Sequence, residues 1–308
     1  MDFFKKFNLI NMIIINIKWI KIVVSIFLIY ILKLLYKNIR VCLCTIGKRE
    51  NLYAKEYVEH YKRYKVDKIF LYDNNDLNGE TFYDVLKEDI RRKYVEIINY
   101  RGINKAQLLA MNDCYKNNNK SYDWLIFYDM DEFIFLKNYK SIRKFLKEKK
   151  FDNCDIVQLH WVQHTDNNKL FIEEGSLAKR FSERGKKIEG LIDIKSIIRG
   201  EILTNITSAH FLNPELKCCN GFGQKKDLLV TIDEKNPDYD YYYIDHYFSK
   251  STEEFIYKIK RGSVAYGNTI RYNIIKSYFK LNNMTSEKID LFEREMNMNL
   301  SELKQKIK

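Results

Sequence analysis

The sequence WLIFYDMDEF, residues 124–133, places three carboxylates directly after a short run of apolar side chains. An apolar run this short, rich in aromatic and branched residues, predicts a buried strand. Alternation along that strand predicts that Asp129 and Asp131 point to one side and Met130 to the other. Because neighbouring carboxylates repel one another and are costly to desolvate, a divalent cation such as Mg²⁺ or Mn²⁺ would offset that cost. The stretch therefore predicts a metal and diphosphate site at the carboxyl end of a strand, and the alternative is an acidic turn leaving a core strand.

The residues before this stretch alternate between strand patterns and helix patterns. Short apolar runs predict strands, and segments with apolar residues at helical spacing lie between them. In chain order, strand and helix alternate at 40–46, 50–64, 68–72, 81–93, 95–98, 105–117 and 124–128. This alternation predicts a parallel sheet with right-handed crossovers, in which ligands gather beyond the carboxyl ends of the strands. Gly47, Asp73 and Asp129 stand at such ends, so we expect them to converge on one edge of the sheet.

The alternation weakens after residue 140. Further apolar runs are strand candidates, at 156–161, 177–181, 194–199 and 228–232. Residues 251–261 predict a helix, with Ser251 or Thr252 as its cap and Glu253 and Glu254 in its first turn. The tail that follows is highly charged and has a helical pattern.

The N-terminal residues are more apolar than the rest of the chain. A spanning helix needs about 20 mostly apolar residues, and residues 19–36 nearly meet this if Lys21 and Lys33 reach the two membrane interfaces. We predict a single-pass membrane anchor, and the alternatives are an interfacial amphipathic helix or an extra packed helix. The predicted parts are a hydrophobic segment at 1–39, an α/β domain at 40–270 and a charged helical tail at 271–308.

Charge and cysteine content limit the classes of partner and compartment. The 308 residues have a formal net charge of +12, but the basic residues are dispersed among acids, which favours a solvated lysine-rich surface over a nucleic-acid interface. None of the six cysteines forms a C-x-x-C pair or a zinc-like cluster. Cys42, Cys44 and Cys114 are predicted to be core thiols, and the sequence does not demand an oxidising compartment.

Several segments together resemble the GT-A glycosyltransferases. Residues 128–133 are similar to the D-x-D motif in its DxDEF form, which occurs in family-2-like enzymes and in family 92. Other segments agree in order and spacing, at 66–75, 107–114, 161–167, 179–181, 195–199, 245–251, 253–255 and 260–262. The resemblance covers about residues 40–265. It implies an α/β domain of the GT-A type, with a Rossmann-like, mostly parallel sheet preceded here by the N-terminal apolar helix.

The resemblance also implies an activity. It implies transfer of a hexosyl group from a nucleotide-sugar donor, a UDP-sugar, to an acceptor hydroxyl on a glycan or glycoconjugate, with inversion at the anomeric carbon. Such enzymes use a divalent cation, Mn²⁺ or Mg²⁺. Three rivals are an aspartate-nucleophile phosphotransferase, a basic nucleic-acid-binding protein and an inactive member of the same fold. Phe133 argues against the first, and the dispersed charge predicts no nucleic-acid partner.

The resemblance assigns roles to individual residues. Asp131 is the predicted direct metal ligand, Asp129 binds the metal directly or through water, and His246 is the third ligand. Alternatively, His246 is a core residue. Asp73 is predicted to bind the base or ribose, or else to cap a turn.

The remaining predicted residues are cations and bases. Lys105, Lys250 and Arg261 are candidates to bind the diphosphate, although each could be a solvated surface charge. Inversion needs a base close to the acceptor hydroxyl. The predicted bases are Asp166, Asp193 and Asp245, with Asp166 preferred.

Overall fold

The computed structural model describes residues 19, 21, 24–27, 39–186, 194–210, 212–225, 238–267 and 272–297. The chain divides into two compact units, residues 1–39 and 40–308. In the first unit, the described residues 19, 21 and 24–27 are helical, and the rest of the predicted anchor lies outside the described residues. Among the described residues, no helix combines the length and the apolar character needed to cross a membrane.

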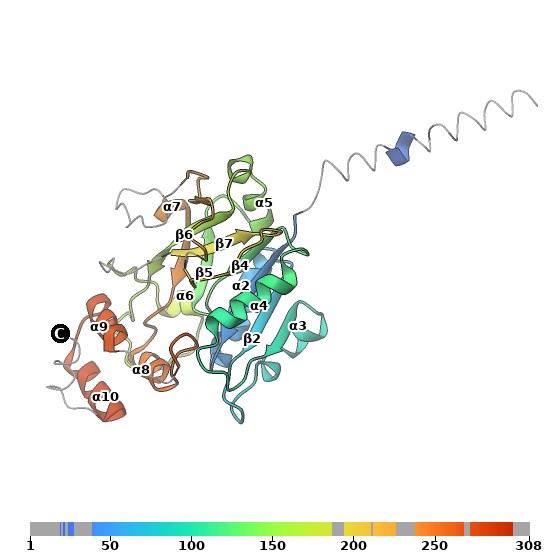
Figure 1. Ribbon diagram of the computed structural model, residues 1–308. Helices are drawn as coiled ribbons and strands as arrows, with labels where there is room; N and C mark the ends of the chain where they lie inside the picture. The colour runs from blue at the N-terminus through green and yellow to red at the C-terminus, as the bar shows by residue number, and fades with distance from the viewer. Residues whose placement is uncertain are drawn as a thin grey trace, which may run out of the picture. The chain divides into compact units, whose positions relative to one another are not determined.

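The first half of the second unit is a parallel α/β fold (Figure 1). Its strands are β1 Val41–Gly47, β2 Lys68–Asp73, β3 Val95–Asn99 and β4 Trp124–Phe127, and between them lie α2 Asn51–Arg63, η1 Phe82–Asp84, α3 Lys87–Arg91 and α4 Gln107–Asn118. The strands are parallel in the order β3-β2-β1-β4. The predicted alternation is confirmed, but the helix predicted at 81–93 is split in two. No residue of α3 is buried, so little packing stabilises a longer helix there.

The predicted convergence at one sheet edge is confirmed. Gly47 pairs directly with Asp73 across β1 and β2. Cys44 pairs with Phe127 across β1 and β4, so the turn that follows β4 starts at the same edge.

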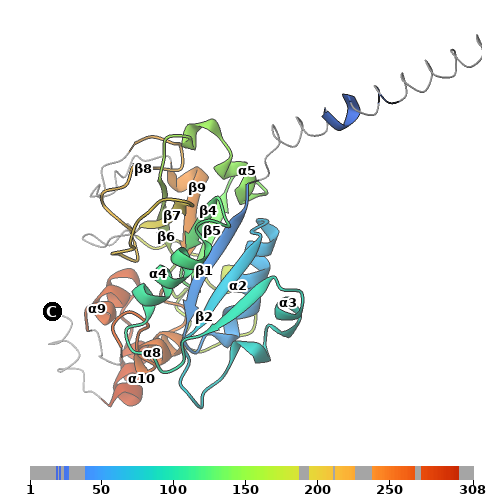
Figure 2. The same cartoon turned by 45° about the vertical axis from the view of Figure 1, so that its right-hand side comes forward.

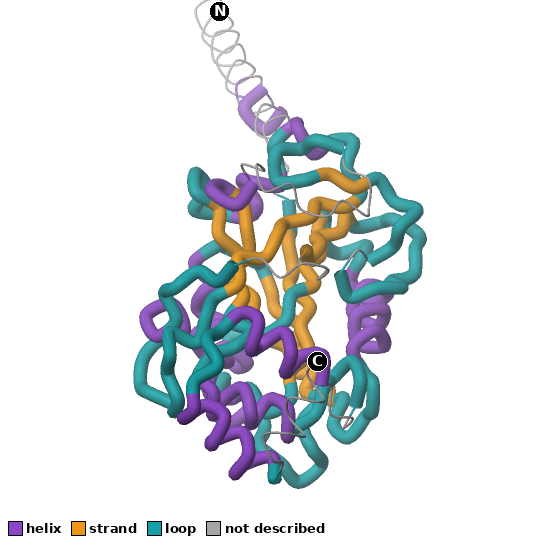
Figure 3. Tube along the Cα trace, turned by 90° about the vertical axis from the view of Figure 1, so that its left-hand side faces the viewer, coloured by secondary structure: helices purple, strands orange, loops and turns teal. Residues whose placement is uncertain are grey.

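The second half of the sheet is mixed rather than parallel. Its elements are β5 Glu132–Leu136, α5 Ile142–Leu146, η2 Lys149–Phe151, β6 Ile156–Gln163, α6 Leu177–Arg180, β7 Ile194–Arg199, β8 Cys218–Cys219, α7 Asp238–Tyr241 and β9 Tyr242–His246. The sheet continues from β4 in the order β7-β6-β9-β5, and β8 pairs with β6. The strand β7 is antiparallel to both β4 and β6, and β5 is antiparallel to β9. In Figure 3 the strands form a central layer with helices and loops around them.

Two predictions of local structure are wrong. Residues 177–181 contain the helix α6 instead of a strand, and Ser176 caps it by accepting a hydrogen bond from the backbone N–H of Lys179. Asp129 and Asp131 lie in a turn between β4 and β5, so strand alternation does not decide where they point. The strand candidate at 228–232 lies outside the described residues.

Three helices near the C-terminus share one core. They are α8 Thr252–Lys260, α9 Tyr272–Leu281 and α10 Ser286–Met296, and they lie together in Figures 1 and 2. Phe255, Tyr278 and Phe292 are fully buried in the hydrophobic cluster between them. The predicted cap of α8 is confirmed, because Ser251 and Glu254 form a capping box. Part of the predicted charged tail therefore packs against the helix that precedes it.

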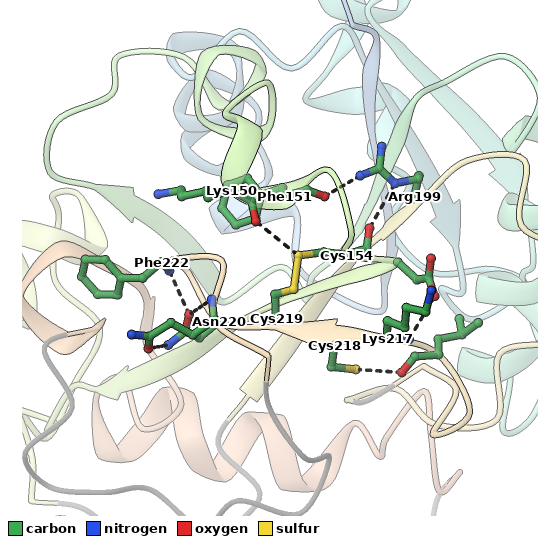
Figure 4. Close-up of a disulfide and its surroundings, with 12 residues drawn as sticks. Lys150, Phe151, Cys154, Arg199, Lys217, Cys218, Cys219, Asn220 and Phe222 are labelled. Carbon is green, nitrogen blue, oxygen red and sulfur yellow. Dashed lines mark hydrogen bonds between the residues drawn. A yellow bond between two sulfur atoms is a disulfide. The ribbon is translucent and has the colours of Figure 1, made fainter.

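Two disulfides correct the prediction for the cysteines. Cys44 of β1 is bonded to Cys114 of α4, so neither is a core thiol. The helix α4 lies on the face of the sheet that contains Cys44, with both residues in one hydrophobic cluster. Cys154 is bonded to Cys219 of β8 (Figure 4). Disulfides persist in oxidising compartments, so the structure indicates such a compartment where the sequence did not.

Candidate active site

The acidic motif lies in a turn that its neighbours hold in place. The buried carboxylate of Glu132 accepts a hydrogen bond from the backbone N–H of Asp129 at 2.9 Å, which closes the turn on itself. The carbonyl of Asp131 accepts one from the backbone N–H of Tyr247, also at 2.9 Å. Gly47 leaves space for the turn, because a Cβ atom there would collide with the sulfur of Met130. The positions of the carboxylates are therefore set by β1, β5 and the end of β9.

The strand register brings polar side chains from three strands into one row. His246 of β9 is paired with Glu132 of β5 on one side and with Gln163 of β6 on the other. Directly paired residues point to the same face of a sheet, and Trp161 shares that face because it lies two residues before Gln163. The ring centroids of Trp161 and His246 are 4.1 Å apart. Segments far apart in the sequence therefore meet beside the acidic turn.

Two lysines offset part of the charge of the three carboxylates. Lys195 of β7 places its Nζ 2.7 Å from Asp129 Oδ2 and 3.4 Å from Glu132 Oε1. Lys258 of α8 places its Nζ 2.7 Å from Asp131 Oδ2. The acidic motif alone predicts a metal to balance these charges, but the protein supplies two ammonium groups itself. One negative charge remains when all three acids are ionised.

The protonation states in the turn follow from burial and from these pairs. Burial works to raise the pKa of Asp131, but the charge of Lys258 and the hydrogen bond that it donates outweigh burial and hold that pKa well below its usual value. Burial raises the pKa of Glu132 well above its usual value, against the charge of Lys195. Burial lowers the pKa of His246 to about 3, so its ring is neutral at pH 7.

The donor atoms in this turn fit a divalent cation. Three residues each offer one ligand atom, and these atoms lie within 4.8 Å of one another. The residues are Asp131, Glu132 and His246. The Nε2 atom of His246 is 3.7 Å from Asp131 Oδ1, too far for a hydrogen bond. A neutral imidazole beside an ionised carboxylate is a donor set that Mn²⁺ accepts. Both carboxylate oxygens of Asp129, by contrast, already have partners, Gln107 at 3.0 Å and Lys195 at 2.7 Å.

The turn opens on a cleft of about 830 Å³. A cleft of this size accommodates a small-molecule ligand. Five residues predicted from the sequence line it together: Asp129, Asp131, His246, Lys105 and Arg261. The rest of its wall includes Lys48, Glu50, Gln107, Trp161, Gln163, His210, Lys258 and Tyr266.

Two predicted donor-binding residues are held elsewhere. Asp73 is buried and forms an ion pair with Arg101 at 3.1 Å. Lys250 is buried as well, with its Nζ 3.6 Å from Glu50 Oε2 and over the ring of Tyr53 at 4.0 Å. Neither is among the described residues that line the cleft.

The preferred base, Asp166, lies in a closed pair, by which we mean a buried ion pair whose carboxylate oxygens are both bonded within the protein. Its Oδ2 accepts a hydrogen bond from the Tyr278 hydroxyl at 2.6 Å and lies 2.7 Å from Lys288 Nζ. Its Oδ1 accepts one from the backbone N–H of Asn168 at 2.8 Å. Asp166 is not among the described residues of the cleft, and both of its oxygens are already bonded.

The other two predicted bases are Asp245 and Asp193. Asp245 precedes His246 in β9, so it points to the opposite face of the sheet. There its Oδ1 lies 2.7 Å from Nε2 of His164. Asp193 lies outside the described residues.

Three residues that hold the acidic turn were not predicted from the sequence. These are Gln107, Lys195 and Lys258. Lys195 left a signal, because it interrupts the apolar run at 194–199 and a buried lysine is seldom unpaired. Lys258 and Gln107 left none, because each lies on a helix whose contacts with the turn are tertiary.

Comparisons with known proteins place the chain in a family. The model of the family described as "Glycosyltransferase family 92" matches residues 37–300. No curated protein matches the chain in sequence.

Solved structures of S. aureus TarS are similar at low identity. The crystal structure of TarS 1–349 is 12% identical, with 84% of this chain and 71% of that chain covered and a TM-score of 0.35. The same fragment in complex with UDP has the same identity and coverage and a TM-score of 0.39. The crystal structure of TarS is 10% identical, with 85% of this chain and 44% of that chain covered and a TM-score of 0.35.

Proposed function

Because the chain belongs to glycosyltransferase family 92 and is thus a glycosyltransferase, we propose that it uses a UDP-sugar and a divalent cation. In this proposal it transfers a hexosyl group to an acceptor hydroxyl on a glycan or glycoconjugate, with inversion at the anomeric carbon. The observation that carries the proposal is the group of Asp131, Glu132 and His246 beside a cleft of about 830 Å³. We also keep the prediction that residues 19–36 anchor the enzyme to a membrane.

The leaving nucleoside diphosphate determines what the site has to do. A bound Mn²⁺ or Mg²⁺ would stabilise the negative charge that develops on the diphosphate. Asp131 and His246 would hold that ion, with Glu132 or Asp129 as the third protein ligand. Lys105, exposed at the cleft, is a candidate to bind phosphate oxygens directly.

We propose for Arg261 a role other than the predicted contact with the diphosphate. Its guanidinium donates hydrogen bonds to the carbonyl of Lys48 and to Glu50 Oε1, the latter at 2.5 Å. It therefore fixes the segment that follows β1 along the cleft wall. Buried Lys250 is paired with the same glutamate, so we propose that both cations position this wall rather than bind the diphosphate.

Inversion requires a base beside the acceptor hydroxyl. Both oxygens of Asp166 are bonded, and Asp245 lies on the opposite face of the sheet, where His164 contacts its Oδ1. We therefore do not carry these two residues into the mechanism. Asp193, which precedes β7, stays a predicted base.

The test is a screen of UDP-sugars and GDP-sugars for binding and hydrolysis, with and without Mn²⁺, on the full chain. We expect Mn²⁺-dependent binding of one donor class. Asp131→Ala should lower the metal-dependent hydrolysis by about 10³-fold, because several kcal/mol of charge stabilisation is lost. Asp84→Ala is the matched control, because Asp84 is exposed and outside the cleft.

Two outcomes would contradict the proposal. Donor binding that needs no metal, or that is unchanged in Asp131→Ala, would remove the metal site. Donor binding without turnover of any donor–acceptor pair would favour an inactive member of the fold.

A further inference from the structure

Lys258 forms an ion pair with Asp131, the predicted metal ligand. It lies on α8, and its Nζ is 2.7 Å from Asp131 Oδ2 and 3.4 Å from the carbonyl oxygen of Phe248. Its side chain is 22% exposed and lines the cleft. The other oxygen of Asp131, Oδ1, faces Nε2 of His246 at 3.7 Å. The Oδ1 side of this carboxylate, beside His246, is thus arranged to bind a divalent cation. The Oδ2 side already contacts the ammonium group of Lys258.

A divalent ion bound by Asp131 and His246 would lie close to that ammonium group. Like charges at such short range repel strongly where water is largely excluded. The four-carbon stem of a lysine is flexible, and its ammonium binds phosphate oxygens as readily as carboxylates. Because the side chain is partly exposed on the cleft, Lys258 has space into which it can move.

The other cations near the acidic turn lack this freedom. Lys195 is almost fully buried and pairs with Asp129 and Glu132. Lys250 is buried against Glu50. Among the described cations of the site, Lys258 alone combines contact with Asp131 and exposure on the cleft.

We propose that Lys258 is a resident cation, which the divalent ion displaces from Asp131 and which then binds the diphosphate of the donor. The inference rests on the proposed function and deepens it. In the free enzyme the ammonium keeps the buried carboxylate paired, which avoids an uncompensated charge. In the loaded enzyme the same ammonium adds positive charge where the leaving group needs it. Metal and lysine therefore compete for Asp131, and both favour the bound diphosphate.

Lys258→Gln tests the inference through two binding affinities that should change in opposite directions. The amide can still donate a hydrogen bond to Asp131 but has no charge. Mn²⁺, titrated alone into the full chain by calorimetry, should bind about tenfold tighter than to the wild type, because its competitor is gone. UDP, titrated at saturating Mn²⁺, should bind about tenfold more weakly, because a charge-assisted contact is lost.

Three further variants make the test specific. Lys260→Gln removes a charge two residues away that is paired with Glu295 on the surface, and both affinities should equal those of the wild type. Lys258→Arg keeps the charge and should leave the Mn²⁺ affinity within about twofold of the wild type. If Lys258→Gln does not fold, Lys258→Met should show the same opposite changes, measured as the shift of its melting temperature by Mn²⁺ and by UDP.

The results distinguish the inference from the function on which it rests. An unchanged or weaker Mn²⁺ affinity in Lys258→Gln, with normal Mn²⁺ binding by the wild type, would overturn the displacement alone. Weaker UDP binding without tighter Mn²⁺ binding would also overturn it. A wild type that binds no Mn²⁺ would overturn both the inference and the proposed metal site.

Discussion

Two buried lysines in this protein make ion pairs of the same length but in different surroundings. Lys195 Nζ lies 2.7 Å from Asp129, and Lys288 Nζ lies 2.7 Å from Asp166. The lysine side chains are 2% and 1% exposed, respectively. Their partners differ, because the Asp129 side chain is 36% exposed and that of Asp166 is 2% exposed. Ion pairs of equal length can therefore serve two purposes, and the exposure of the acid distinguishes them.

The surroundings support this distinction. Around Lys288, the Nζ also lies 3.0 Å from the carbonyl oxygen of Asn283, and Asp166 is bonded at both oxygens. That pair is closed and buried, which is typical of a structural role. Around Lys195, the three acids of the turn share two lysines, and Asp129 lines the cleft. Titratable groups with shifted pKa values at a cleft, such as Asp131 and His246, are typical of a functional site.

Lys288→Met should produce the larger effect, on stability. It leaves Asp166 buried without its counter-ion, which costs about 3–5 kcal/mol in the free energy of unfolding. Denaturant unfolding of the variant and the wild type measures this difference. Donor hydrolysis per folded molecule should stay within about twofold of the wild type. A stable variant with impaired hydrolysis would break the comparison, because the closed pair would then act in the reaction.

Lys195→Met should affect activity more than stability. Its partner Asp129 can be solvated, and Glu132 can take up a proton, since burial already raises the pKa of that carboxyl group. We expect a loss of stability smaller than that of Lys288→Met. The acidic turn would lose a tether, and misplacement by about 1 Å costs about 10²-fold in kcat/KM. Separate kcat and KM values measure the loss, and unchanged kinetics would contradict a positioning role.

The parallel half of the fold could be predicted because its information is local. Each strand from β1 to β4 is a short apolar run followed by a polar residue or turn, and helices lie between them. The mixed half could not be predicted in the same way. The strand β5 is completed by β9, which lies far along the chain, and the pairing of Glu132 with His246 leaves no local pattern.

The residues of the candidate site show the same difference between local and tertiary information. Asp129, Asp131 and His246 belong to short motifs, so the sequence and the family resemblance indicated them. From the sequence alone, Asp166 is a candidate base in a polar loop. In the fold, Lys288 of α10 is its counter-ion, which the local sequence does not reveal. Only the tertiary fold shows that a charged residue has a counter-ion from another element.

The smallest expected effect is on the pH dependence of stability, and it concerns Glu254. This glutamate is a second closed acid, bonded to Arg180, to the hydroxyl of Tyr53 and to Ser251 at 2.6 Å. Burial works to raise the pKa of Glu254, but the hydrogen bonds from Arg180, Ser251 and Tyr53 outweigh it, and the net effect is a lowered pKa. A carboxyl group with a lowered pKa stabilises the fold at pH values above its unfolded pKa. That contribution is lost as the pH falls through the folded pKa.

Glu254→Gln should therefore be less stable than the wild type at neutral pH, and the difference in melting temperature should shrink as the pH falls below about 4.5. Thermal melts of both proteins across this range measure the difference. Exposed Glu174→Gln is the control and should follow the wild type at every pH. A difference that stays constant with pH would mean that Glu254 acts through packing and not through its charge. In that case the charge of a buried acid such as Glu254 would not stabilise the fold. The exposure of the acid would then no longer explain why the Lys288 pair and the Lys195 pair have different roles.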